Sequence, residues 1–198
     1  MPDVGETYSW PTEADYAWVD DWQEAFCVAL VHVRTPQEVL SRLMPEPPTG
    51  IVSVEEARRW AEAQGPPHYG TSIEAGTLGD WTLAVELLGY HATLQHVLRR
   101  LAEGTAAVVV YRSVNADMSF QWAVNGAILR WFDPLLYVNQ SWAGEPLPEE
   151  NGLLFGLGHA LSSAFACAER LTHVRLTRPV LEDRAGWIAI GHHLGPGE

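Results

Sequence analysis

The sequence contains no lysine. All 12 of its basic side chains are arginine, they face 25 acidic ones, and the formal net charge is −13. Nucleic acids and anionic membranes are bound by proteins that present a basic surface, because binding replaces the counterions around the phosphates. We therefore expect no nucleic acid and no membrane among the partners of this protein.

Cysteine is scarce, and long apolar runs are lacking. Cys27 and Cys167 lie in apolar stretches, which is typical of buried thiols and not of a disulfide scaffold or a metal site. No segment approaches the roughly 18 apolar residues that a membrane-spanning helix needs. The first ten residues lack the basic and apolar regions of a secretory signal. These absences predict a soluble, cytoplasmic protein.

Catalytic and metal-binding motifs are also lacking. No G-x-S-x-G nucleophile elbow is present. His91 and His96 are off a common helix face, and His192 and His193 point to opposite sides of a strand. We predict no metal and no cofactor, although His32, His173 and His192 could meet in space. Whether the chain is an enzyme stays open.

What is present is a strong pattern of strands in residues 105–134. Ala106 to Val114 is apolar on both faces for most of its length, as expected for a central strand, and Met118 to Val124 alternates between apolar residues on one face and Ser119, Gln121 and Ala123 on the other. Asn125-Gly126 is typical of a two-residue hairpin turn. A regular hairpin would pair Trp122 with Leu129, Phe120 with Trp131, and Gln121 with Arg130.

The rest of the chain supplies helices and a second hairpin. Capping boxes begin helices after Thr35 and Ser53. Gly79-Asp80 predicts a hairpin in which Glu74 falls on the apolar face, and residues Leu153 to Leu171 predict the longest helix. Together the patterns predict an α+β fold: a mainly antiparallel sheet of about five to seven strands with a central meander and helices mostly on one face. Residues 1–12 are expected to be a flexible arm, and residues 13–198 a single domain.

Three segments resemble an actinobacterial family of unknown function. They are DYAWVDDWQEAFCVALVHVRTPQEVLSRL, GDWTLAVELLGY and AAVVVYRSVNADMSFQWAVNGAILRWFDPL. The helix AFACAERLTHVRLT resembles the C-terminal part of that family. The resemblance implies lineage and fold, without an activity.

A ligand site is predicted at the end of the central strand, from Glu86, Arg112, Asn115 and His159. These polar groups lie on or beside apolar elements, where burial is costly unless they pair or bind a ligand. The alternative for Arg112 and Glu86 is an internal salt bridge that only supports the fold.

Nine tryptophans are several times the usual share, and two of them lie in an arm or a loop. Trp10 and Trp142 are candidates for a partner-binding surface, because aromatic anchors are typical of interfaces. We therefore expect a non-catalytic module that binds a protein or peptide, with an immunity or accessory biosynthetic partner as a special case. The alternative is a small tailoring enzyme that acts on a peptide or small molecule in a pocket between the sheet and the long helix.

Overall fold

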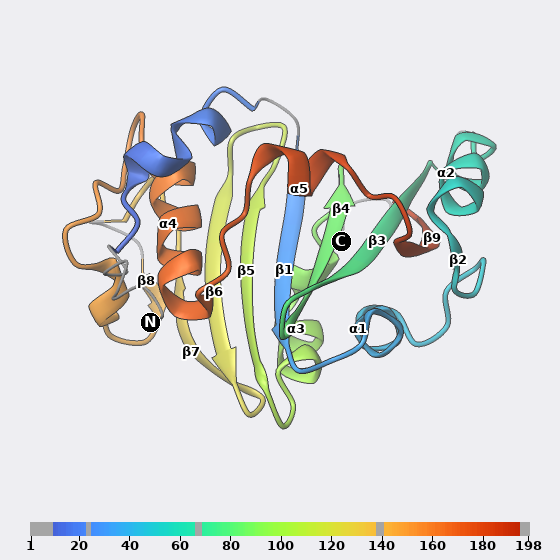
Figure 1. Cartoon of the computed structure of the whole chain (residues 1–198), viewed down its shortest axis with the longest axis horizontal. Coiled ribbons are helices and arrows are strands. Elements are labelled where there is room, and N and C mark those ends of the chain that lie inside the picture. Colours follow the sequence, from blue (N-terminus) through green and yellow to red (C-terminus); the bar gives the residue numbers. More distant parts are fainter. Residues whose placement is uncertain (1–9, 23–24, 66–68, 138–140, 195–198) are drawn as a thin grey trace, which may run out of the picture.

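The computed structural model describes residues 10–22, 25–65, 69–137 and 141–194. They form one antiparallel sheet of nine strands in the order β2-β9-β3-β4-β1-β5-β6-β7-β8 (Figure 1). The strands are β1 (Phe26–His32), β2 (Val52–Ser53), β3 (Gly70–Leu78), β4 (Trp81–Leu87), β5 (Ala106–Arg112), β6 (Met118–Val124), β7 (Ala127–Phe132), β8 (Ser141–Ala143) and β9 (Ile188–His193). The α+β class is confirmed, but five to seven strands is too few. β2 and β8 escape prediction because two or three residues are too short to show an alternating pattern.

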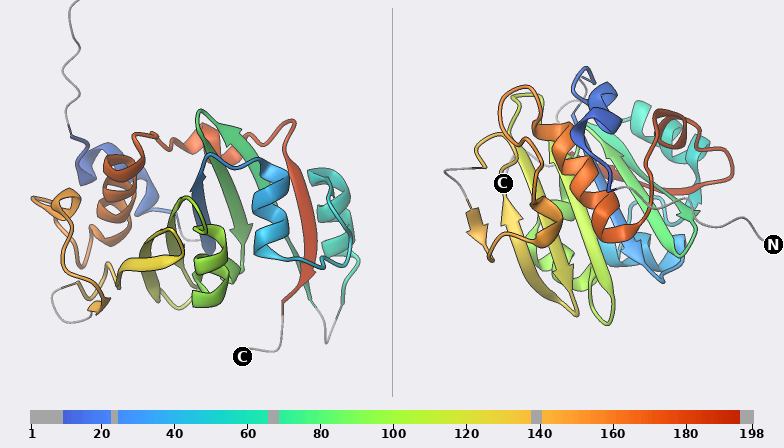
Figure 2. Two further views of the ribbon diagram at one scale, coloured as in Figure 1. Left: turned by 90° about the horizontal axis from the view of Figure 1, so that it is seen from below. Right: turned by 60° about the vertical axis from the view of Figure 1, so that its left-hand side comes forward.

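Helices cover both faces of the sheet, so the prediction of helices mostly on one face is wrong. The α-helices are α1 (Pro36–Leu43), α2 (Val54–Glu62), α3 (Gln95–Leu101), α4 (Ala160–Thr172) and α5 (Arg178–Glu182), and the 3-10 helices are η1 (Glu13–Val19), η2 (His91–Thr93) and η3 (Pro148–Glu150). One face is packed by α1, α3 and η2, and the other by η1, α4 and α5 (Figure 2). The physical reason is visible in β1 and β5, whose residues are apolar on both sides and need cover on both.

The central hairpin forms at Asn125-Gly126, but its register shifts after two residue pairs. Val124 pairs with Ala127 and Ala123 with Ile128, and a β-bulge at Trp122 then places Arg130 opposite Trp122. The expected pairs of Trp122, Phe120 and Gln121 are therefore each wrong by one residue on β7. The bulge turns Leu129 outward and buries Arg130.

Gly79-Asp80 closes the second hairpin in the predicted register, with Leu78 opposite Trp81. Glu74 accordingly lies on the same face as Val85, which belongs to the apolar core. Only 1% of Glu74 is exposed. A buried carboxylate on an apolar face needs partners, and those partners form part of the site described below.

The long helix begins at Ala160, seven residues later than predicted. Gly156 and Gly158 have φ angles of +106° and +88°, which a right-handed helix does not allow. Leu157 lies within the predicted range of the helix, but it is outside the helix and 93% exposed. From Ala160 to Ala168 every residue of α4 is buried, so this helix is covered on more than one side.

Candidate functional site

The four residues of the predicted ligand site do not come together. Glu86 lies opposite Cys27, whereas Arg112 lies opposite Phe26 one position away. Because neighbouring positions of a strand face opposite sides of the sheet, Glu86 and Arg112 point to different faces and form no ion pair. Arg112 instead donates to the backbone carbonyl of Trp22.

Asn115 and His159 lie at the surface. Asn115 is exposed in the turn between β5 and β6, where its backbone N–H donates to Ser113 Oγ at 3.1 Å. His159 is exposed and directly precedes α4, so it does not face the sheet. The pocket expected between the sheet and the long helix is thus not formed by these residues.

Trp10 and Trp142 keep the exposure that a partner-binding surface needs. Trp10 is 48% exposed, and its ring centre lies 5.0 Å from the Arg170 guanidinium. Trp142 is 47% exposed, and its ring centre lies 5.2 Å from that of Trp131. Of the predicted arm, residues 1–9 lie outside the described residues. Pro11 is held at α4, because its carbonyl accepts a hydrogen bond of 2.7 Å from Arg170 Nε.

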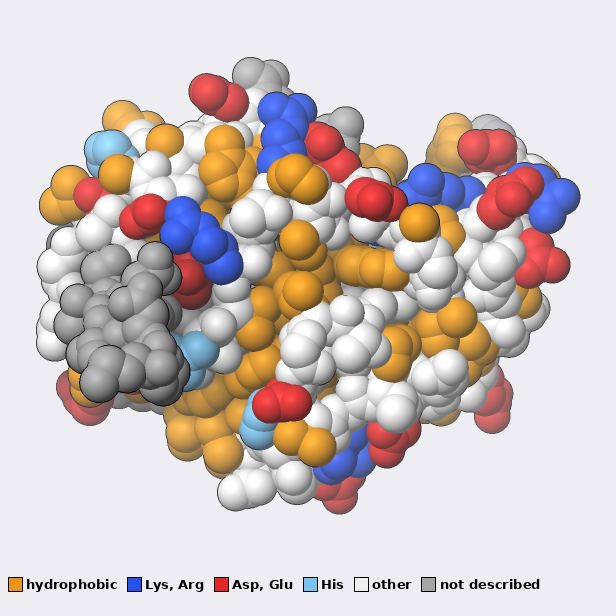
Figure 3. All heavy atoms as spheres, in the orientation of Figure 1, with side chains coloured by type: hydrophobic (Ala, Val, Ile, Leu, Met, Phe, Trp, Pro, Cys, Tyr) orange, Lys and Arg blue, Asp and Glu red, His pale blue; other side chains and the backbone are white. Residues whose placement is uncertain are grey.

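A cleft of about 610 Å³ opens near the end of the sheet that contains β9 and β3, between α2 and the segment that joins α5 to β9. Figure 3 shows this hollow, with basic side chains at its base and acidic ones on both sides. Its lining is Ser53, Val54, Glu55, Arg58, Arg59, Glu62, Glu182, Arg184, Ala185, Gly186 and Trp187. The volume falls within the range of sites for small molecules or short peptide segments.

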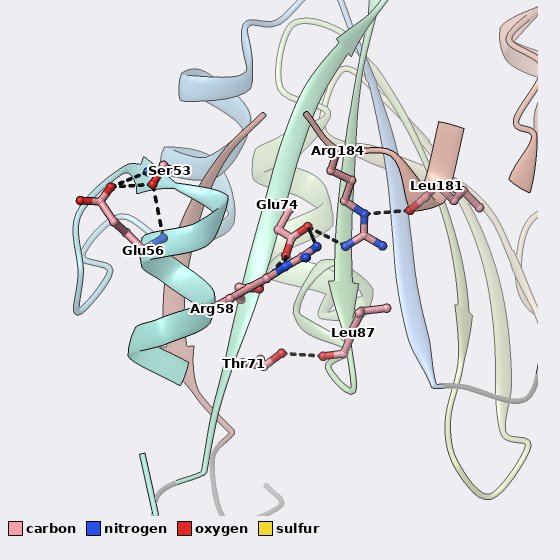
Figure 4. A network of polar contacts seen from close by, with 9 residues as sticks. Ser53, Glu56, Arg58, Thr71, Glu74, Leu87, Leu181 and Arg184 are labelled. Carbon is pink, nitrogen blue, oxygen red and sulfur yellow. Dashed lines mark hydrogen bonds and ion pairs between the residues drawn. The ribbon is translucent and has the colours of Figure 1, made fainter. Parts of the chain in front are cut away.

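The floor of the cleft is formed by two guanidinium groups, which the buried carboxylate of Glu74 holds from beneath (Figure 4). Arg58 donates from Nε and Nη2 to the two oxygens of Glu74, at 2.6 and 2.8 Å. Arg184 donates from Nη1 to Glu74 Oε2 at 2.6 Å and from Nε to the carbonyl of Leu181 at 2.8 Å. Ser72 adds a hydroxyl donor to Glu74 at 3.0 Å. The carboxylate therefore fixes both arginines in position.

Three elements far apart in the sequence build this floor. The capping box between Ser53 and Glu56 begins α2 and so places Arg58 one turn later over β3. Arg184 follows the short helix α5, whose N-cap Thr177 accepts a hydrogen bond from the N–H of Val180. The indole of Trp187 occupies the space that a side chain at Gly76 would need, which brings the α5–β9 segment close to β3.

The ion pairs beneath the cleft favour the charged forms of Glu74 and Arg58. Burial raises the pKa of the Glu74 carboxyl, but the ion pairs with Arg58 and Arg184 outweigh it, so that its pKa lies below the ordinary value. The hydrogen bonds to Glu74 raise the pKa of Arg58. The Arg58 side chain is still 48% exposed, and its Nη1 has no hydrogen-bond partner in the described part of the chain. That group is available to a ligand.

A second polar cluster lies on the opposite face of the sheet, where β4, η2 and β9 meet. Glu86 Oε1 is 2.6 Å from His192 Nε2, and Glu86 Oε2 accepts a hydrogen bond of 2.8 Å from the backbone N–H of His91. One ligand atom from each of Glu86, His91 and His192 lies within 4.8 Å of the others, which is the only such group of three found among the described residues. Burial lowers the pKa of His91, so its ring favours the neutral form.

Sequence reasoning missed both clusters for the same reason. Arg184 contacts Glu74, and His192 contacts Glu86, across more than 100 residues of the chain, which no local pattern predicts. The one available signal was Glu74, an acid on an otherwise apolar strand face. The histidines predicted as candidates for meeting, His32, His173 and His192, do not form a group of ligands within the described residues.

The comparisons with known proteins give a family without an activity. A family model described as "Family of unknown function (DUF6461)" matches residues 9–146. The chain belongs to this family. The match covers Arg58, Glu74, Glu86 and His91 of this DUF6461 member, while Arg184 and His192 lie beyond it. The actinobacterial origin suggested by the resemblance stays a prediction.

Searches of curated proteins and of solved structures found no match for this DUF6461 protein. Across the described residues, no helix of this family member is both long and apolar enough to span a bilayer.

Proposed function

We propose that this protein is a non-catalytic binding module whose α2–α5 cleft recognises a peptide that carries a carboxylate and a basic side chain. The observation that carries the proposal is the cleft floor, where buried Glu74 holds Arg58 with half of its side chain exposed. A protein or peptide partner of this chemistry also suits an immunity or accessory role.

The floor suits a carboxylate because the Nε and Nη2 donors of Arg58 are already bound to Glu74, while its Nη1 still offers a charge-assisted hydrogen bond to a second carboxylate. Arg58 is already fixed by Glu74, so little side-chain entropy is lost when a ligand binds. Arg184 adds a second positive charge beneath the same cleft. Both features favour a ligand carboxylate over a neutral group.

The rim suits a basic group. Glu55, Glu62 and Glu182 line the cleft, and the side chains of Glu55 and Glu182 are 84% and 56% exposed. Together with the net charge of −13, these carboxylates favour a positively charged partner and repel a wholly acidic one. A peptide of mixed charge satisfies both the floor and the rim.

The lining of the cleft favours binding over catalysis. It contains no histidine and no cysteine, and its single serine is engaged in the capping box, where Ser53 donates to Glu56 at 2.7 Å. A nucleophile needs a base within hydrogen-bond reach, and these lining residues supply no such pair. The cleft also lies away from α4, where the alternative of a tailoring enzyme would need its pocket.

Selection from a peptide library tests the proposal. The full chain is immobilised, a library of peptides with free C-termini is applied, and the Kd of a selected peptide is measured by calorimetry. Arg58→Met should weaken binding at least about tenfold, because one desolvated charge-assisted contact is worth about 1.5–3 kcal/mol. The matched control is Arg99→Met, an exposed arginine on α3.

Two results would contradict the proposal. One is a library that yields no peptide with a basic residue and a carboxylate. The other is equal binding by wild type, Arg58→Met and Arg99→Met, which would place the peptide elsewhere, for instance at Trp10 or Trp142.

A further inference from the structure

We propose that Glu86, His91 and His192 bind one divalent transition-metal ion, with Zn²⁺ as the representative, in a site of two imidazoles and one carboxylate. The three residues come from β4, η2 and β9, and their ligand atoms lie within 4.8 Å of one another. The site lies on the opposite face of the sheet from the peptide cleft and is independent of the function proposed for that cleft.

The ligand types match the ion. Imidazole nitrogen and carboxylate oxygen are common ligands of Zn²⁺ and of the neighbouring first-row metals. Three protein ligands leave at least one coordination position for water or a small molecule, which distinguishes such a site from a closed structural one. His91 is only partly buried, so that position has a route to solvent.

The surroundings of His192 orient it as a metal ligand. Its Nδ1 lies 2.9 Å from the backbone carbonyl of His193. A carbonyl only accepts, so Nδ1 carries the hydrogen and Nε2 is directed toward Glu86. Metal-binding histidines typically donate their second ring N–H to such a carbonyl, because that bond fixes the ring and its tautomer.

The surroundings of Glu86 are equally specific. Its Oε2 is held by the N–H of His91, which leaves Oε1 directed at His192. Gly89 packs against this carboxylate so closely that a Cβ there would overlap it. On the far side, the gap between Cys27, Ala92 and Glu86 has no room for a water molecule.

Binding of a metal ion also resolves the close contact between Glu86 and His192. His192 Nε2 and Glu86 Oε1 lie 2.6 Å apart and point toward one another, so both atoms are directed at the place where a metal ion would bind. A bound ion would replace the hydrogen bond between them, and because metal ligands generally lose their protons on binding, Zn²⁺ binding should release protons.

The test uses the full chain after dialysis against a chelator. Zn²⁺ is titrated in competition with a chromophoric chelator, Co²⁺ is titrated to record its d–d absorption bands, and proton release is measured in weakly buffered solution. The variants are His91→Ala, whose partly exposed ring can be removed with the least disturbance, and Glu86→Gln. The control is His159→Ala, an exposed histidine outside the cluster.

We expect one Zn²⁺ per chain, a release of protons on binding, and Co²⁺ bands typical of a site with fewer than six ligands. His91→Ala should weaken Zn²⁺ binding at least about 100-fold, since even the loss of an outer partner costs 10- to 100-fold. His159→Ala should bind like the wild type. The proposal is overturned if the wild type binds no Zn²⁺, or if a correctly folded His91→Ala protein, checked by circular dichroism, binds it as tightly as the wild type.

Discussion

Two buried arrangements of arginine and glutamate lie at opposite ends of the sheet, and they differ in how completely they are closed. At β7, Arg130 pairs with Glu150 through Nε–Oε1 and Nη2–Oε2 distances of 2.7 and 2.9 Å, and the two side chains are 2% and 1% exposed. At β3, Glu74 is 1% exposed, but its partner Arg58 is 48% exposed.

The remaining contacts of the arrangement at β7 show that its polar groups are bound within the chain. Tyr137 and the N–H of Leu147 complete the hydrogen bonds of Glu150, and Arg130 also donates to the carbonyl of Gly144 at 3.0 Å. Burial raises the pKa of Tyr137 to about 12, so its hydroxyl stays a donor to Glu150. The arrangement at β7 is satisfied within the chain and serves the fold, whereas that at β3 faces a cleft and suits a ligand.

The largest expected effect on stability comes from a substitution that breaks the closed pair of Arg130 and Glu150. Arg130→Met leaves the carboxylate of Glu150 buried without its partner, and such a loss costs about 3–5 kcal/mol. We expect the free energy of unfolding, measured by chemical denaturation, to fall by that amount. A fall of less than about 1 kcal/mol would show that the closed pair is not needed by the fold.

The next effect concerns the carboxylate beneath the cleft. Glu74→Gln leaves two arginines side by side, but the half-exposed Arg58 can turn toward water, so the free energy of unfolding should fall by less, about 2–3 kcal/mol. Glu55→Gln, a change at the exposed rim, is the control and should leave the denaturation midpoint unchanged. Equal denaturation midpoints for the two variants would mean that the contacts of Glu74 with Arg58 and Arg184 do not stabilise the fold.

The pH dependence of stability tests the role of the Glu74 carboxylate. A carboxyl whose folded-state pKa is lowered stabilises the fold above its unfolded pKa of about 4.3, and this stabilisation is lost as the pH falls through the lowered value. The pKa of Glu74 is lowered in this way. Between pH 5 and pH 3 the wild type should therefore lose more stability than Glu74→Gln, as measured by denaturation at each pH. Parallel losses would contradict the ion-paired state of Glu74.

The smallest effect on stability is expected for Arg58→Met. A pair with one exposed partner contributes less than about 1 kcal/mol, and the aliphatic part of the side chain is kept. The change should leave the denaturation curve close to that of the wild type while it weakens peptide binding. A loss of stability as large as that of Glu74→Gln would make Arg58 a part of the scaffold.

The hairpins could be predicted from the sequence because their signals are local. Asn125-Gly126 and Gly79-Asp80 fix two turns, and the alternation of β4 and β6 fixes their faces. The bulge at Trp122 could not be predicted, since it depends on the burial of Arg130 against Glu150, which lies 20 residues further on. Gln121 shows the same limit: its polar side chain is 1% exposed, because it donates to the carbonyl of Thr93, which lies 28 residues earlier.

The candidate site was less predictable than the fold. Arg184 lies in the segment that leads into β9 and His192 lies on β9 itself, and β9 pairs with β3 more than 100 residues earlier. Glu74 was the exception, since an acid on an apolar strand face marks a place that needs partners. The predicted pairing of Glu86 with Arg112 is wrong. The two residues lie on β4 and β5, on either side of β1, and their side chains point to opposite faces of the sheet.

The central claim is that the open arginine floor binds the carboxylate of a peptide. The most direct test compares one selected peptide with a free C-terminus and the same peptide with an amidated C-terminus, for the wild type and for Arg58→Lys. Lysine keeps the charge but loses the planar fork. We expect amidation to weaken binding by the wild type at least about tenfold, the cost of one charge-assisted hydrogen bond, and to change binding by Arg58→Lys much less. Equal effects of amidation on the two proteins would contradict the claim.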